Sequence, residues 1–180
     1  QLKLIYPVEQ SLKKTNRENF VTLPEDRVAI FFAGNEITAS FNGTASTGLD
    51  TNDYLLPNIS FGGKSISFLQ SSEAGITRQL FIESQPKDTS GNSFRFRVVN
   101  TSSSGDLLEI TPSKNIQAEN VWLLDEKYSE FIDITVKNKF SIVPQDDPRY
   151  YTLLIGSPEY INSIRSKFLP VEYILYQNYP

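Results

Sequence analysis

The chain has 180 residues, of which 39% are hydrophobic and 21% are charged, and its formal net charge is −4. This length and composition fit one globular domain that can bury a sizeable core. Lys and Arg are scattered, which argues against the basic stripe of a nucleic-acid-binding protein, and no run approaches the roughly 18 apolar residues of a membrane span.

The sequence contains no His, Cys or Met. Without His the chain lacks the commonest general base and zinc ligand, and it cannot form a Ser-His-Asp or Cys-His arrangement. Without Cys it has neither disulfides nor thiolate chemistry, which leaves its compartment open. Because it begins at Gln1 and has no Met, we expect it to be part of a longer or processed protein.

Most of the chain has the pattern of β-strands separated by turns rich in Gly, Asn, Ser and Asp. Alternation is clearest at residues 93–100, where Phe94, Phe96 and Val98 share one face and the intervening arginines share the other. The expected strands are residues 27–32, 35–42, 64–70, 77–84, 93–100, 106–111, 121–125, 131–137, 140–143 and 150–156.

Helical patterns are few. Residues 157–168 predict a helix, because Ser157 can cap it, Pro158 suits its first position, and apolar residues recur at helical spacing. Residues 11–19 form either a short polar helix or a loop.

The strand rhythm predicts an all-β fold: an antiparallel two-sheet β-sandwich, jelly-roll or immunoglobulin-like, with a short helix near the C-terminus. We expect residues 27–168 to form the sandwich module. Residues 1–26 would pack on it as an N-terminal strand and loop, and residues 169–180 would form a linker.

The last residues carry a specific motif. Leu175, Gln177, Asn178, Tyr179 and Pro180 resemble the L-x-Q-N-Y-P opening of the C-terminal sorting domain used by the type IX secretion system of Bacteroidota. The resemblance implies a secreted or cell-surface protein whose sorting tag would follow the linker. The alternative is an ordinary C-terminal strand with a tail.

A second resemblance covers parts of the body. Residues 37–57, 121–125 and 140–156 are similar, in their order, to β-sandwich modules that often precede such sorting tags. This resemblance implies a fold and a position within a larger exported protein, and it implies nothing about catalysis.

One loop could bind a metal. Asp50, Asn52 and Asp53 offer oxygen ligands within four residues, a spacing that could hold structural Ca²⁺. A full EF-hand pattern is missing, so the alternative is an Asx-rich turn whose side chains bond their own backbone. We expect no other cofactor.

Three aromatic residues are candidate ligand-binding residues. Trp122, the only Trp, could stack on the apolar face of a sugar ring if its side of the strand is solvated; the alternative is that both faces of a central strand are buried, under the partner sheet or a long loop. Tyr150 and Tyr151 are adjacent and should point to opposite faces of a strand, so that at most one of them is in the core.

We expect that this domain is not an enzyme. Candidate carboxylate pairs are Glu119 with Asp125 and Asp146 with Asp147, but acidic residues in turns are usually solvated. The sequence favours a non-catalytic accessory module that binds polysaccharide or glycan and is joined to upstream domains of the same chain. The alternatives are a structural spacer or adhesion domain without a small ligand, and a carboxylate-based glycoside hydrolase.

Overall fold

The structure is a computed structural model that describes residues 25–56, 63–71, 77–116 and 120–168. The expected linker at residues 169–180, with its sorting motif, therefore lies outside the described residues. The same is true of the polar segment at residues 11–19, of nearly all of the expected N-terminal segment, and of Glu119.

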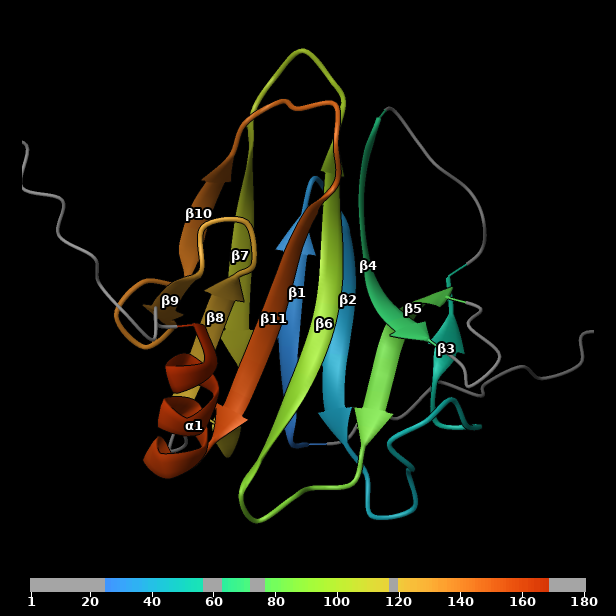
Figure 1. Ribbon diagram of the computed structural model, residues 1–180. Helices are drawn as coiled ribbons and strands as arrows, with labels where there is room; N and C mark the ends of the chain where they lie inside the picture. Colours follow the sequence, from blue (N-terminus) through green and yellow to red (C-terminus); the bar gives the residue numbers. More distant parts are fainter. Residues whose placement is uncertain (1–24, 57–62, 72–76, 117–119, 169–180) are drawn as a thin grey trace, which may run out of the picture.

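Within the described residues the chain forms mainly strands, followed by one short helix (Figure 1). The elements are β1 (Arg27–Phe32), β2 (Asn35–Phe41), β3 (Tyr54–Leu55), β4 (Lys64–Ser71), β5 (Thr77–Gln85), β6 (Gly91–Asn100), β7 (Asp106–Pro112), β8 (Asn120–Asp125), β9 (Glu130–Asp133), β10 (Lys139–Ile142), β11 (Arg149–Gly156) and α1 (Pro158–Phe168). The predicted all-β class and C-terminal helix are confirmed. The strand expected at residues 131–137 ends at Asp133, and β3 was not predicted.

The strands join in one curled sheet, which resembles half a barrel (Figure 1). The order is β10-β7-β1-β2-β5-β4-β6-β11-β8-β9, and β3 pairs with β5. The predicted division into two sheets is therefore not confirmed. The expectation of antiparallel pairing alone is wrong at β2 and β5, which run parallel. Parallel neighbours need a long connection, and here β3 and β4 lie within it.

The core fills the inside of the curl. In β6, Phe94, Phe96 and Val98 are fully buried, as their alternation predicts. Residues near both ends of the strand order, such as Ile110 of β7 and Leu123 of β8, belong to the same buried cluster. Curling thus lets one sheet enclose its own apolar face within the described part of the chain.

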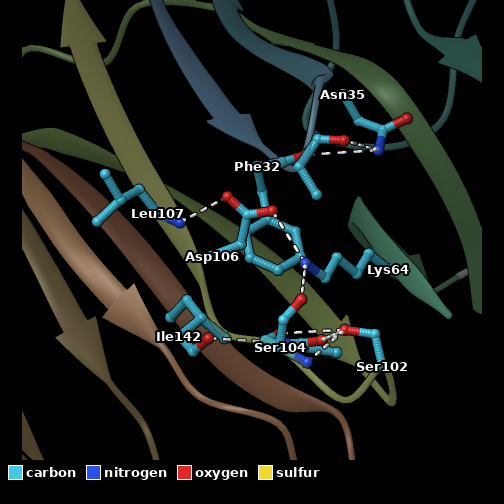
Figure 2. Close-up of polar contacts among 10 residues, drawn as sticks. Phe32, Asn35, Lys64, Ser102, Ser104, Asp106, Leu107 and Ile142 are labelled. Atoms are coloured by element: carbon cyan, nitrogen blue, oxygen red, sulfur yellow. Dashed lines mark hydrogen bonds and ion pairs between the residues drawn. The ribbon is translucent and has the colours of Figure 1, made fainter. Parts of the chain in front are cut away.

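Polar contacts tie the loops together at one end of the curl (Figure 2). The Lys64 Nζ at the start of β4 lies 3.1 Å from Asp106 Oδ2 and donates to Ser104 Oγ at 3.2 Å. The fully buried Asn100 donates from Nδ2 to the carbonyl oxygens of Ser104 and Ile142, each at 3.1 Å. These contacts connect β4 and β6 to β7 and β10, which lie toward the other end of the strand order.

Helix α1 packs on the outer face of β8 and β11 (Figure 1). Ser157 caps it as predicted, because its Oγ accepts a hydrogen bond from the Tyr160 N–H at 3.2 Å. The Tyr160 ring lies so close to Gly91 that an added Cβ there would come within 2.3 Å of the ring. In the described part of the chain, no helix has the length and apolarity to span a membrane.

Candidate functional site

Trp122 lies beneath α1. On the outer face of β8 it packs with a small cluster that includes Leu124, Leu154 and Ile161, which is 3% exposed. The guanidinium carbon of Arg165, also from α1, lies 5.3 Å from the centre of the indole ring. The arrangement favours the alternative in which this side of the strand is covered, but the cover is helix α1 and not the expected partner sheet or long loop.

Tyr150 and Tyr151 point to opposite faces of β11, as expected for neighbours in a strand. Tyr151 is 2% exposed and its ring stacks on Phe96, with the ring centres 5.4 Å apart. Burial raises the pKa of the Tyr151 hydroxyl above its usual range. Of the two tyrosines, therefore, only the half-buried Tyr150 is available to a ligand.

Tyr150 borders a hollow between the β8–β9 turn and the segment that enters β11. We call it the Tyr150 hollow; its volume is about 390 Å³, and it is lined by Glu126, Lys127, Gln145, Asp147, Pro148, Arg149 and Tyr150. This volume is at the lower end of the range of small-molecule sites, roughly 300–1,000 Å³. The hollow could thus admit a small part of a larger ligand.

Glu126, in the wall of the hollow, is held by three hydrogen bonds. Arg95 donates to it from Nε at 2.9 Å and from Nη2 at 2.8 Å, and Thr152 Oγ1 donates at 2.9 Å. Burial acts to raise the pKa of Glu126, but these bonds outweigh burial and lower it. The Arg95 guanidinium also lies 4.9 Å from the centre of the Tyr150 ring, so the pair helps to fix that ring.

Arg149 forms an ion pair with Asp125, which is 2% exposed. Its guanidinium carbon lies 5.3 Å from the ring of Tyr151 on the core side and 5.1 Å from the ring of Tyr128 at the surface. We call this series the Tyr128 ladder; from core to rim it consists of Phe96, Tyr151, Arg149 and Tyr128. The Arg149 Nε is buried and has no hydrogen-bond partner among the described residues.

Tyr128 stands at the outer end of this ladder with 61% of its surface exposed. It belongs to the β8–β9 turn, in which the Lys127 N–H donates to Asp125 Oδ1 at 3.1 Å and Ser129 adopts a φ of 51°. Sequence reasoning missed Tyr128, because a short turn has no hydrophobic period. The signal that could have found it is a large aromatic residue isolated among charged residues.

The candidate metal loop is a self-bonded turn. Asp50 accepts hydrogen bonds from the Ser46 N–H at 2.5 Å and from the Asn52 N–H at 2.6 Å. Asp53 accepts from the Asp50 N–H at 3.0 Å and from the Ser84 N–H at 2.9 Å. Their oxygens thus already accept backbone donors, which favours the Asx-turn alternative.

No group of three or more Asp, Glu, His or Cys side chains is placed to hold a metal in the described ranges. The Ca²⁺ site at Asp50, Asn52 and Asp53 stays a prediction. Of the candidate carboxylates, Asp125 is paired with Arg149, Asp146 and Asp147 are exposed, and Glu119 lies outside the described residues.

Comparison of the chain with known proteins identifies no relative. No protein-family model matches the sequence, and no curated protein or solved structure is significantly similar to it. Any function assigned to the chain therefore depends on its own residues and their geometry.

Proposed function

We propose that the domain is a non-catalytic accessory module of a secreted or cell-surface protein and that it binds glycan at the Tyr150 hollow. The observation that carries this proposal is the exposed ring of Tyr128, held by the Tyr128 ladder close to a hollow lined with polar side chains. Exposed aromatic rings on rigid supports are what sugar rings stack on, because the C–H face of a sugar is flat and apolar.

The hollow supplies hydrogen-bonding groups to accompany the rings. Gln145 can both donate and accept, Asp147 accepts, and Lys127 donates, so sugar hydroxyls would find partners of either kind. Because Tyr128 and Tyr150 each pack against an arginine, little conformational entropy remains for them to lose on binding.

The charges at the hollow favour binding over hydrolysis. A glycoside hydrolase needs one carboxyl group that is protonated and can act as a general acid. Glu126 has a lowered pKa because Arg95 and Thr152 bond its charged form, and Asp125 is engaged by Arg149. Glu126 is therefore poorly suited to give up a proton to a glycosidic oxygen.

The place of the domain in a larger exported protein is supported by the motif at Leu175, Gln177 and Asn178–Pro180, which resembles a sorting-tag opening. In this proposal the partners of the domain are a polysaccharide and the upstream domains of the same chain. The module would hold those domains close to their glycan, and it would need no chemistry of its own.

The direct test is retention of the 180-residue chain on insoluble cellulose, chitin, xylan, mannan and starch, each with and without EDTA. We expect retention on at least one polymer, and Tyr128→Ala should weaken it by about 1–3 kcal/mol, the usual effect of losing an aromatic anchor. The matched control is Leu55→Ala, which truncates an exposed side chain (52%) on β3. Retention on none of the polymers would instead favour the spacer alternative.

A further inference from the structure

We propose that the glycan bound at the Tyr150 hollow is uncharged: a neutral polysaccharide, and not a uronic-acid or sulfated one. This inference rests on the proposed function. It comes from the way in which the charged side chains around the hollow are already paired.

The guanidinium groups of Arg95 and Arg149, near the hollow, are each paired with a protein carboxylate. Proteins usually recognise carboxylates and sulfates with an arginine that donates two parallel hydrogen bonds. At Arg95 those two donors, Nε and Nη2, are bonded to the two oxygens of Glu126 at 2.9 and 2.8 Å. Arg149 is paired with the buried Asp125. An acidic sugar would therefore meet guanidinium groups whose charge is already balanced by a protein carboxylate.

The remaining charges cancel. Of the residues that line the hollow, Lys127 and Asp147 form no ion pair within the described ranges, and they carry opposite charges. An anionic ligand would thus meet one cation and one repelling carboxylate. The net charge of −4 on the whole chain adds a weak long-range repulsion of polyanions.

The buried Nε of Arg149 has no acceptor among the described residues, but it does not offer an anion site. The atom is buried, and the guanidinium is flanked by the rings of Tyr128 and Tyr151. On the side of Tyr128, this guanidinium already faces the ring on which the sugar is proposed to stack. A ligand carboxylate here would also come close to Asp125, whose charge is already paired with this guanidinium.

The test compares polymers that differ in charge alone. Wild-type chain is titrated with xylan and sulfated xylan, with dextran and dextran sulfate, and with methyl-esterified and de-esterified homogalacturonan. We expect the neutral member of the bound pair to bind at least about tenfold more tightly, and its Kd to stay constant between roughly 50 and 500 mM NaCl, because no ion pair is screened. Tyr128→Ala should weaken this binding at least about fivefold, whereas Leu55→Ala should not.

Tighter binding of a charged member, weakening as NaCl rises, would overturn the inference while leaving a glycan-binding function in place. Equal affinity for both members of a pair would also overturn it. Binding to none of these polymers and to none of the insoluble ones would overturn both proposals together.

Discussion

Trp122 lies within β8 and Tyr128 lies in the turn that follows it, and each ring packs against an arginine. The Arg165 guanidinium carbon lies 5.3 Å from the Trp122 ring, and that of Arg149 lies 5.1 Å from the Tyr128 ring. The difference is what covers them: α1 packs over Trp122, whereas Tyr128 is 61% exposed. Whether an aromatic ring is exposed to a ligand thus depends on segments that come much later in the chain.

The largest effect should come from Asp125, the counter-ion of Arg149 in the Tyr128 ladder. Asp125→Ala would leave the guanidinium of Arg149 mostly buried, with its side chain 17% exposed, and without its counter-ion. Removing one partner of a buried ion pair costs about 3–5 kcal/mol. We expect the free energy of unfolding, measured in urea, to fall by this amount.

The control for that variant is Glu126→Ala, which removes the more exposed pair with Arg95, whose side chain is 53% exposed. Exposed pairs contribute less than about 1 kcal/mol. If both variants lost the same stability, Arg149 would not depend on Asp125 in the way described.

A pH-dependent loss of stability should arise away from both aromatic regions, at Glu83 of β5. Glu83 is 4% exposed; its Oε1 accepts a hydrogen bond from Gln85 Nε2 at 2.9 Å, and its Oε2 has no partner among the described residues. Burial, opposed by the Gln85 bond and assisted by the charge of Asp53, raises its pKa from 4.5 to about 7.

The direction of this pH dependence follows from the coupling between protonation of Glu83 and folding. A carboxyl whose pKa is raised by folding stabilises the fold fully below its unfolded pKa of 4.5, and this stabilisation is lost as the pH rises through about 7. The free energy of unfolding should therefore fall by up to about 3 kcal/mol between about pH 4.5 and pH 8. With no His in the chain, few other groups titrate in this range. Glu83→Gln should flatten the dependence, and an equally steep curve in that variant would refute the assignment.

The next effect is smaller: replacing Trp122 should reduce the free energy of unfolding more than replacing Tyr128 does. Trp122→Ala removes a half-buried ring from the cluster beneath α1, and we expect about 2 kcal/mol of destabilisation, less than for a fully buried Trp. Tyr128→Ala should cost below about 1 kcal/mol, the scale of one exposed cation–π contact. The measurement is thermal or urea unfolding of both variants; equal losses would mean that Tyr128 is a structural residue like Trp122.

The smallest effect should come from metal removal. Because the oxygens of Asp50 and Asp53 already accept backbone N–H groups, the turn needs no cation to order it. We expect EDTA or excess Ca²⁺ to change the melting temperature by less than about 1 °C. A larger rise with Ca²⁺, abolished by Asp50→Asn, would restore the metal site.

The sequence predicted strand faces better than strand partners. Alternation of apolar and polar residues located the buried side of β6, since side chains of a strand point alternately to its two faces. The same pattern says nothing about pairing direction, so the parallel β2–β5 pair and the continuous sheet were missed.

For the candidate site, the sequence placed Tyr150 and Tyr151 on opposite faces but could not say which one was buried. It also could not foresee that α1 would cover Trp122, because this contact joins segments far apart in the chain. Tyr128 had no periodic signal at all, since a turn is ordered by local hydrogen bonds such as that between Lys127 and Asp125.

The most direct test of the glycan site is an NMR titration of the isotope-labelled chain with an oligosaccharide of the polymer that retains it. The chain has a single Trp, so one indole N–H resonance reports on Trp122 without ambiguity. We expect the backbone resonances of Lys127, Tyr128 and Tyr150 to shift on binding while the indole resonance stays in place. A shift of the indole resonance with Tyr128 unchanged would contradict the account and return the site to Trp122.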